Sequence, residues 1–394
     1  MSTAGRRALI ADDLTGALDT GIHFLSDSVA PSLVVIERQA NGSEVAGGTR
    51  GISDLLVVDT ESRHLEPALA YRHVRQVTRA LVKDGYAPFF KKIDSTLRGN
   101  VGTEIDAMLD ILRWPLAAII PAVPASGRIV ADGKCFVRGV PLHLSESGAD
   151  QLTPHTTSSL MEIVGSQSQR RGRHIDRHQL SQPADRLAQD IATLARAGTE
   201  LLFFDAASQN DMSRILNVVE RLGQPVLYVG AAGLAVAMAA AEQARRRRAG
   251  DGAAVLATFM GRRALFVAGS RMQTTAEQVE HLLKAQQRVG GVTAVPAAIL
   301  GDGAAELQRV VGAARAVVRS GRHVLLRVAP EDGELAAGDV GEARQRAARI
   351  AEFLGTCVRE IVHESTVSLL VATGGSTAIA AMRALNVTTL RLIG

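Results

Sequence analysis

The decisive stretch of this chain is PFFKKIDSTLRGN, residues 88–100. Its first three residues are apolar and suit the end of a buried strand, whereas the rest gathers two lysines, an arginine, a carboxylate, two hydroxyls and an amide. In an open α/β sheet, ligands bind at the carboxyl ends of the strands. The cations suit a carboxylate or phosphate, and Asp94 and Asn100 suit hydroxyl groups or a metal. The stretch therefore predicts a site for a small, oxygen-rich, anionic substrate.

Other apolar runs in the chain have the length of strands that are covered on both faces. Helical patterns alternate with them, as at 66–83 and 342–363. This alternation predicts an α/β fold with mainly parallel sheets. Repeated glycines at 127–150 predict instead a β-hairpin or flap. The apolar runs lie at 9–11, 33–36, 55–58, 117–120, 201–205, 226–229, 264–268, 324–328 and 369–372.

We expect two domains. The segment 249–254 is small, charged and contains glycine, which is typical of a linker. It separates an N-terminal domain, residues 1–248, from a C-terminal domain, residues 255–394. Each domain is predicted to hold a mainly parallel sheet flanked by helices, with a substrate cleft between the two. A chain of 394 residues, 46% of them hydrophobic, can bury two such cores.

Composition argues against several classes of protein. The net charge is +4, but only 3% of the residues are aromatic, and the basic run 245–248 fits a solvated helix end, so we expect no nucleic-acid partner. No apolar run approaches the ~18–20 residues that span a bilayer, and no signal peptide precedes the first strand. We therefore expect a cytoplasmic protein without a membrane partner. Cys135 and Cys357 are far apart, which argues against a disulfide framework or a cysteine zinc site.

Several polar groups follow predicted strands of the N-terminal domain. One carboxylate of Asp12 and Asp13 can bind a substrate hydroxyl or accept its proton while the other caps the next helix, although capping alone is the alternative. Arg98 has the fork geometry that grips a carboxylate. Arg63 is either a second clamp or part of a surface salt bridge, and Arg128 is a third cation on a strand-end loop.

Two glycine-containing turns follow strands of the C-terminal domain. Ser270 closes a Gly-Ser turn that can offer N–H groups and a hydroxyl to phosphate, although plain turn chemistry is the more common reason for such a turn. Gly374 and Gly375 permit close backbone approach, and Ser376 or Thr377 can cap the next helix and donate to phosphate. The arrangement suits a nucleotide, although the P-loop pattern is absent.

Together these segments resemble the four-carbon acid sugar kinase family, whose members phosphorylate tetronates or 3-oxo-tetronates with ATP. The resemblance extends along nearly the whole chain, in the order of the family. It rests on ADDLTGA (11–17), DTESR (59–63), KKIDSTLRGN (91–100), PAVPASGR (121–128), VAGS (267–270) and ATGGST (372–377).

The resemblance implies roles for the candidate residues. It implies that the sugar acid is bound by Arg63, Lys92, Arg98, Asn100 and Arg128. Of these, Arg98 and Arg63, alone or together with a lysine, are expected to hold the carboxylate. It further implies that Asp94 and Asp12 or Asp13 orient the hydroxyls, and that one of them accepts the proton. ATP, with Mg²⁺, is expected at Ser270, Gly374, Gly375, Ser376 and Thr377, and no dedicated protein metal site is predicted.

Residues 92–98 resemble the tetronate kinases more than the 3-oxo-tetronate kinases. We therefore expect phosphorylation of D-threonate or D-erythronate at the terminal hydroxyl, giving the 4-phosphate. The sequence leaves a homodimer open.

Two departures from the family bear on the nucleotide site. Many relatives carry an acidic residue where Ser376 stands, and members usually continue past Gly394 into a glycine-rich motif that helps to hold ATP. We therefore expect a C-terminal domain that is truncated at its end. The alternatives are a 3-oxo-tetronate kinase, or a sugar-acid-binding protein that lacks a full ATP site. A nicotinamide dehydrogenase is disfavoured because no Gly-x-Gly-x-x-Gly opens the first helix.

Overall fold

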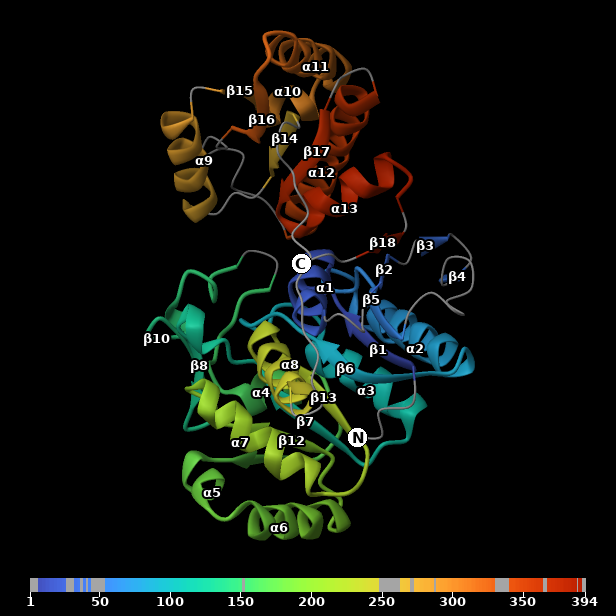
Figure 1. Ribbon diagram of the computed structural model, residues 1–394, viewed down its shortest axis with the longest axis vertical. Coiled ribbons are helices and arrows are strands. Elements are labelled where there is room, and N and C mark those ends of the chain that lie inside the picture. The colour runs from blue at the N-terminus through green and yellow to red at the C-terminus, as the bar shows by residue number, and fades with distance from the viewer. Residues whose placement is uncertain are drawn as a thin grey trace. The chain divides into compact units, whose positions relative to one another are not determined.

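The computed structural model describes residues 6–25, 32–35, 38–39, 42–43, 54–150, 153–247, 263–269, 273–286, 288–329, 340–363, 367–387 and 389–391. Its contacts divide the chain into two compact units (Figure 1). The N-terminal unit comprises residues 1–256 and 389–394, and the C-terminal unit comprises residues 257–388. The predicted linker at 249–254 lies outside the described residues.

A nine-stranded sheet forms the centre of the N-terminal unit. All neighbouring strands are parallel except the pair at one edge, where the last strand runs antiparallel to its neighbour with Leu390 opposite Leu33. In order across the sheet, the strands are β11 (Gly172–Ile175), β12 (Leu201–Phe204), β7 (Leu116–Ile120), β13 (Val226–Gly230), β6 (Tyr86–Lys92), β1 (Arg6–Ala11), β5 (Leu55–Asp59), β2 (Ser32–Val35) and β18 (Thr389–Arg391).

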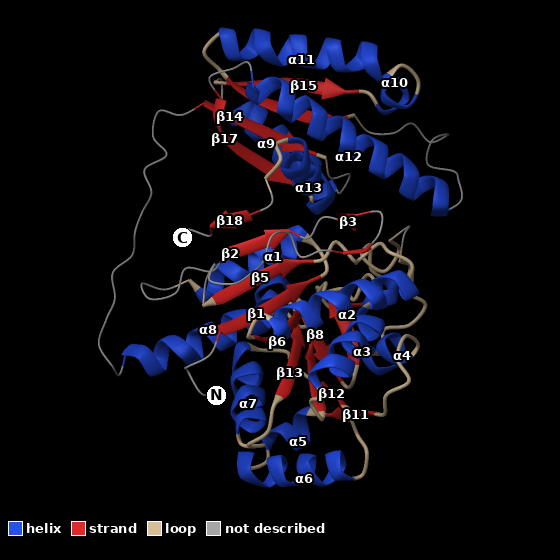
Figure 2. Cartoon of the chain, turned by 90° about the vertical axis from the view of Figure 1, so that its right-hand side faces the viewer, coloured by secondary structure: helices blue, strands red, loops and turns tan. Residues whose placement is uncertain are grey.

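The central strands are apolar on both faces because helices cover both faces (Figure 2). Leu9 and Ile10, for example, are neighbours on β1 and both are fully buried. One side carries α1 (Leu14–Gly21), α7 (Gln209–Glu220) and α8 (Ala232–Arg247), and the other carries α2 (Pro67–Lys83), α3 (Val101–Leu112) and α4 (Leu160–Gly165). Two further helices, α5 (Arg177–Ser181) and α6 (Ala184–Arg196), pack with α7.

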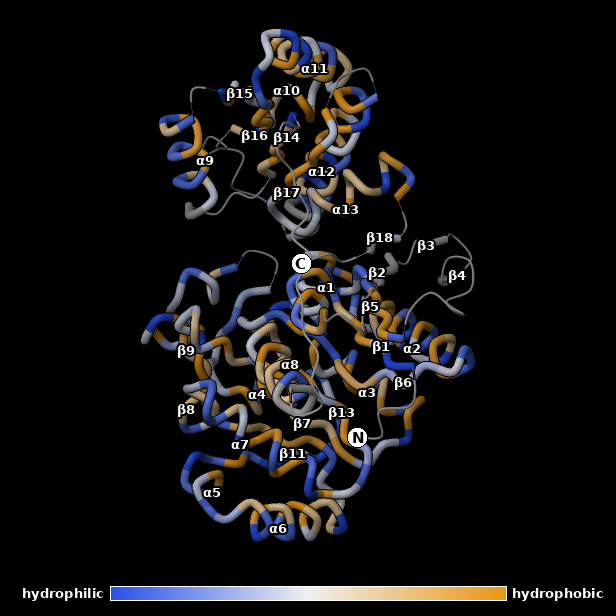
Figure 3. The backbone as a smooth tube through the Cα atoms, viewed as in Figure 1, coloured by the Kyte–Doolittle hydropathy of each residue, from blue (hydrophilic) through white to orange (hydrophobic). Residues whose placement is uncertain are grey.

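Helix α2 shows how the sequence sets these elements. Pro67 occupies its first turn, where a missing N–H is harmless, and Val74, Val77 and Leu81 place one apolar stripe against the sheet. The hydropathy colouring shows hydrophilic and hydrophobic residues alternating along the helices (Figure 3).

The predicted hairpin is confirmed as a three-stranded antiparallel ribbon. It consists of β8 (Arg128–Ala131), β9 (Lys134–Val137) and β10 (Val140–Pro141). A separate two-stranded ribbon is formed by β3 (Arg38–Gln39) and β4 (Gly42–Ser43). The 3₁₀ turns are η1 (Ile22–Phe24), η2 (Pro124–Ser126) and η3 (Leu142–Leu144).

The C-terminal unit is built on a parallel four-stranded sheet. Its order is β15 (Val289–Ala294), β16 (His323–Val328), β14 (Arg263–Ala268) and β17 (Val367–Thr373). Buried residues of α10 (Pro296–Leu300), α11 (Gly303–Arg319), α12 (Val340–His363) and α13 (Gly375–Ala384) pack together with Leu265 and Val267. A second cluster joins Val279 of α9 (Gln273–Ala285) to Ala268. None of the described helices in either unit is both long and apolar enough to cross a bilayer.

Candidate active site

Three neighbouring strands of the N-terminal sheet deliver charged groups to one edge. Asp12 and Asp13 follow β1, Arg63 lies in the loop after β5, and Asp94 and Arg98 lie in the loop after β6. Strand β1 lies between β5 and β6, and all three are parallel. Their carboxyl ends therefore meet, and that edge is where α/β sheets bind ligands.

Arg63 is held by the two carboxylates that follow β1. Its Nε donates to Asp12 Oδ2 at 2.9 Å, and its Nη2 donates to Asp12 Oδ1 at 3.0 Å and to Asp13 Oδ1 at 2.7 Å. Asp13 also caps α1 by accepting from the N–H of Gly16 at 3.0 Å. The Arg63 side chain is only 9% exposed, so these contacts form a buried ion-pair cluster and not a surface salt bridge.

A second fork lies in the loop after β6. Arg98 donates from Nε to Asp94 Oδ2 at 3.0 Å and from Nη2 to Asp94 Oδ1 at 2.9 Å. Asp94 also accepts from the N–H of Thr96 at 3.0 Å and from its hydroxyl. The Arg98 side chain is 34% exposed, and its Nη1 lies 3.7 Å from Asp150 Oδ2. Unlike Arg63, Arg98 therefore keeps an accessible edge.

Unusual backbone conformations allow the loop of Arg98 to lie against the loop of Arg63. Leu97 is buried with φ 60, a conformation that strains a bulky residue. Gly99 has φ 91, and a Cβ there would lie 2.9 Å from Arg63 Cγ. Asn100 Nδ2 donates to the carbonyls of Ser62 at 3.1 Å and Leu65 at 2.9 Å. These N–H groups thus tie the loops together, and the role of Asn100 in binding substrate stays a prediction.

The two lysines at the end of β6 reach different elements, as their alternation along the strand predicts. Lys92 Nζ donates to the carbonyl of Ile93 at 2.9 Å and lies against the first turn of α1, since a Cβ on Gly16 would be 2.6 Å from it. Lys91 is fully buried, and its Nζ lies 2.6 Å from Glu104 Oε2 of α3. Lys92 is therefore the lysine beside the Asp12–Asp13 turn.

The carboxyl groups of the site are of two kinds, those whose pKa is lowered by nearby cations and one whose pKa is raised. Burial raises the pKa of Asp94, but the Arg63 charge and the hydrogen bonds from Arg98 and Thr96 outweigh it and hold that pKa well below its usual range. Asp12 is similar: burial opposes ionisation, yet the charges of Arg63 and Lys91 lower its pKa. Both are therefore ionised at neutral pH.

Asp59, at the end of β5, is the opposite kind and was not singled out from the sequence. It is fully buried, its Oδ1 accepts from the N–H of Glu61 at 2.9 Å, and its Oδ2 has no hydrogen-bond partner in the described part of the chain. Burial, together with the negative charges of Glu61, Asp13 and Asp12, raises its pKa well above the usual value. The motif DTESR contains Asp59, but a single sequence does not show that this carboxyl lacks a cation.

Arg128 differs from the other two arginines. It begins β8 in the segment after β7, whose carboxyl end lies at the same edge of the sheet as that of β6. Its Nε is buried without a hydrogen-bond partner among the described residues, and no described carboxylate pairs with it. Arg128 is thus a cation still available to an anionic ligand.

The predicted nucleotide segments come together within the C-terminal unit. Strands β14 and β17 are adjacent, with Ala268 opposite Thr373. A Cβ on Gly269 would lie 2.0 Å from Thr377 Oγ1, so only glycine permits this approach. Thr377 is 4% exposed and Ser376 is exposed, while Ser270 lies outside the described residues.

The start of α13 has the features of a phosphate cradle. Gly374 precedes the helix with φ 93, and no side chain in the described part of the chain caps its first N–H groups. Free N–H groups at a helix start, reached through glycine, fit a phosphate. Among the described residues, no group of three or more His, Cys, Asp or Glu side chains is placed to hold a metal.

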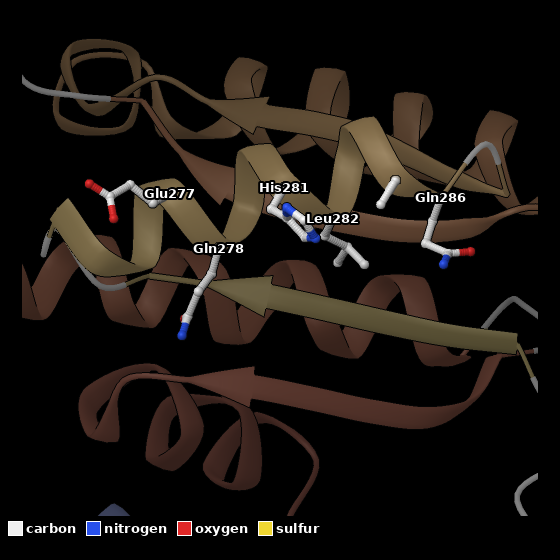
Figure 4. A pocket seen from close by; sticks show the side chains of 6 residues that line it. Glu277, Gln278, His281, Leu282 and Gln286 are labelled. Atoms are coloured by element: carbon white, nitrogen blue, oxygen red, sulfur yellow. The ribbon is translucent and has the colours of Figure 1, made fainter. Parts of the chain in front are cut away.

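A surface hollow of about 660 Å³ also lies in the C-terminal unit. It is lined by one face of α9, with Glu277, Gln278 and His281, and by Gln286 just after the helix (Figure 4). None of the predicted nucleotide residues lines it.

Known proteins match both halves of the chain. Residues 7–238 match the family described as a sugar-binding N-terminal domain, and residues 265–394 match a nucleotide-binding C-terminal domain. A D-threonate kinase of Salmonella typhimurium is 31% identical over 96% of this chain and 86% of the relative. A D-erythronate kinase of Heliobacterium modesticaldum is 29% identical over 96% and 85%. A 3-oxo-tetronate kinase of Brucella melitensis is 30% identical, but over 70% and 62%.

Solved structures share the architecture. A Salmonella typhimurium protein described as a putative tRNA synthase has a TM-score of 0.76 at 21% identity, covering 98% of this chain and 89% of that one, which shows the fold alone. A Bordetella bronchiseptica protein described as a domain-swapped dimer with bound citrate has a TM-score of 0.50 at 26% identity, covering 97% and 86%. With both domain matches and the full-length relatives, the chain belongs to the four-carbon acid sugar kinase family.

Proposed function

We propose that this protein uses ATP to phosphorylate the terminal hydroxyl of D-threonate or D-erythronate, giving the 4-phosphate. The observation that carries the proposal is the buried cluster of carboxylates and guanidinium groups at the ends of β1, β5 and β6. It offers cations for a carboxylate and ionised oxygens for hydroxyl groups, as a sugar acid requires. Relatives that match over nearly the full length of the chain are kinases of these two acids.

The three arginines have different roles in binding the sugar acid. Arg63 is enclosed by Asp12 and Asp13, so it organises the site by fixing both carboxylates. Arg98 has an exposed edge and Arg128 has no protein partner in the described part of the chain, so these two receive the substrate carboxylate. Lys92 adds a positive charge at the Asp12–Asp13 turn.

Asp94 orients the hydroxyl that is phosphorylated. Because Arg63, Arg98 and Thr96 keep its pKa low, it stays ionised and accepts a hydrogen bond from that hydroxyl. A carboxylate with so low a pKa is a weak general base. Phosphoryl transfer tolerates this because positioning and charge neutralisation supply most of its rate. Asp12 and Asp13 serve the remaining hydroxyls.

We assign ATP to the C-terminal unit, with its phosphates at Gly374, Gly375, Ser376 and Thr377 and at the turn that ends in Ser270. The close contact between Gly269 and Thr377 and the uncapped start of α13 support this assignment. Magnesium, bound to the ATP phosphates, would neutralise the charge that develops during transfer.

The test is coupled ADP release with magnesium-ATP against D-threonate, D-erythronate, L-threonate and their 3-oxo forms. We expect turnover with D-threonate or D-erythronate and weaker turnover with the 3-oxo acids. Preference for a 3-oxo acid would overturn the substrate assignment. Sugar acids that raise the melting temperature without any ADP release would favour a binding protein instead.

We also propose a homodimer. The Bordetella relative is described as a domain-swapped dimer, and in this chain a terminal strand, β18, completes the edge of the N-terminal sheet. Exchange of an identical element between two copies is a low-cost route to a dimer. Light scattering after size-exclusion chromatography should give twice the 41.6 kDa chain mass, and a monomer at micromolar concentration would refute the dimer.

A further inference from the structure

The carboxylate of Asp205, at the end of β12, grips the tip of the β8–β9 hairpin. It is fully buried, accepting from the N–H of Asp132 at 3.0 Å on Oδ2 and from the N–H of Gly133 at 2.9 Å on Oδ1. His174 Nε2 lies 2.8 Å from the same Oδ1 and donates to it, because an ionised carboxylate only accepts. Such charge-assisted bonds are about twice as strong as neutral ones.

The hairpin is held on both sides. Val130 and Ala206 exchange two backbone hydrogen bonds of 3.0 Å, which joins β8 to the end of β12. On the other side, the N–H of Cys135 donates to Ser158 at 2.8 Å, and the N–H of Leu160 donates to Gly133 at 2.9 Å. The hairpin is therefore clamped between the end of β12 and residues 158–160, and does not behave as a free flap.

The clamped elements lead to the proposed sugar-acid site. Arg128 is the first residue of β8, two residues before the Val130–Ala206 contact. The segment that precedes Ser158 carries His155, whose Nε2 lies 2.8 Å from the carbonyl of Thr96, beside Asp94. A continuous set of contacts thus connects Asp205 with Arg128 and with the loop of Asp94.

We propose that Asp205 and His174 are positioning residues for the sugar acid: together they form a clip that fixes the hairpin and thereby the place of Arg128. Neither residue is assigned a contact with substrate. The inference rests on the proposed function, because it takes Arg128 as a ligand of the substrate carboxylate. It predicts that loosening the clip weakens binding of the sugar acid and leaves binding of ATP unchanged, since the ATP residues belong to the other unit.

Asp205→Asn is the informative variant, and Asp211→Asn is its matched control. An asparagine presents one acceptor oxygen where the carboxylate presents two, so one hairpin N–H loses its partner. Asp211 also accepts two backbone N–H groups nearby, from Ala207 and Ser208 at 3.0 Å each, but has no hydrogen bond to the hairpin. Both of these bonds end on Asp211 Oδ2, so an asparagine can keep them, and Asp211→Asn therefore controls for the loss of a nearby carboxylate charge.

Hydrogen exchange of residues 127–141 tests the clip without any catalysis. In Asp205→Asn the hairpin amides should exchange about 10–100-fold faster than in the wild type, whereas Asp211→Asn should leave them unchanged. Unchanged hairpin exchange in Asp205→Asn would overturn the clip even if the enzyme proves to be a kinase.

Steady-state kinetics then test positioning. Asp205→Asn should raise the KM for the sugar acid on the order of tenfold, with the KM for ATP unchanged and a smaller effect on kcat. An equal rise in Asp211→Asn, or none in Asp205→Asn, would refute the role. If Asp205→Asn does not fold, His174→Leu removes one donor and should show the same pattern more weakly, while His174→Gln keeps a donor and should lie closer to the wild type. Fast hairpin exchange in Asp205→Asn, together with a wild-type protein that turns over none of the acids, would instead reject the proposed function and leave the clip standing.

Discussion

Replacing Lys91 by methionine should destabilise the N-terminal unit far more than any surface lysine change. Lys91 is fully buried and Glu104 is 1% exposed, with their charged atoms 2.6 Å apart. Methionine keeps most of the volume but leaves Glu104 buried without a cation. Removing one partner of such a pair costs about 3–5 kcal/mol. At about 2–4 °C per kcal/mol for a domain of this size, the melting temperature should fall by about 6–20 °C.

Urea unfolding of the single variants and of Lys91→Met/Glu104→Leu provides the assay. The double variant should recover most or all of the lost stability, because a buried ion pair is often no better than apolar residues of similar volume. Burial already raises the pKa of Glu104 against the pull of Lys91. The loss in Lys91→Met should therefore be smaller at pH 5 than at pH 8, since protonation of Glu104 relieves it. A single variant that loses less than about 1 kcal/mol, or a double variant no more stable than the single, would refute the reasoning.

Three further predictions concern other parts of the molecule. The pKa of Asp59 is raised by burial and neighbouring carboxylates, so its contribution to stability is complete below the unfolded pKa and is lost as pH rises through the folded pKa. Asp59→Asn should therefore flatten the fall of unfolding free energy between pH 5 and pH 8, and an unchanged fall would show that Asp59 is already ionised in the folded protein. Arg63→Lys breaks a buried, forked ion pair and should lower the free energy of unfolding by about 3–5 kcal/mol. Arg128→Lys should instead raise the KM for the sugar acid with little change in melting temperature. The reverse pattern would exchange the roles of the two arginines. In Gly269→Ala the new Cβ would lie 2.0 Å from a side-chain oxygen, so this variant should raise the KM for ATP, as ATP titrations can decide. In Gly312→Ala the new Cβ has open space on α11, so melting curves should show the protein stabilised by about 0.5–1 kcal/mol.

Most of the fold could be predicted because parallel strands buried on both faces are continuous apolar runs. That signal identified β5 and β7 within one residue at each end, and for β1 it found the end of the strand but missed its first three residues. It failed for β11, whose residues are mostly polar and of which only Ile175 is buried, because an edge strand needs little apolar sequence. Helices α6 and α11 were also not singled out, although Pro183 precedes α6 and Asp302 caps α11.

The residues that make up the candidate site could be predicted from the sequence, but the contacts between their side chains could be predicted much less well. The motifs identified Arg63, Asp94 and Arg98 as residues that belong together, and the structure brings them to one edge. The partners of Arg63 are about 50 positions away, and no local pattern encodes that contact. The same limit hid Asp205, whose hold on the hairpin depends on the crossing of β8 over the end of β12.

The pairing of β18 with β2 also has a consequence for the order of synthesis. The N-terminal unit begins at the start of the chain, yet its sheet receives its outermost strand only after the whole C-terminal unit has left the ribosome. Until then β2 is an open edge, which attracts strands of other nascent chains. An N-terminal fragment that ends at residue 256 keeps that edge permanently and should aggregate during expression. Fusing residues 389–394 behind residue 256 through a flexible tether should restore a well-behaved domain.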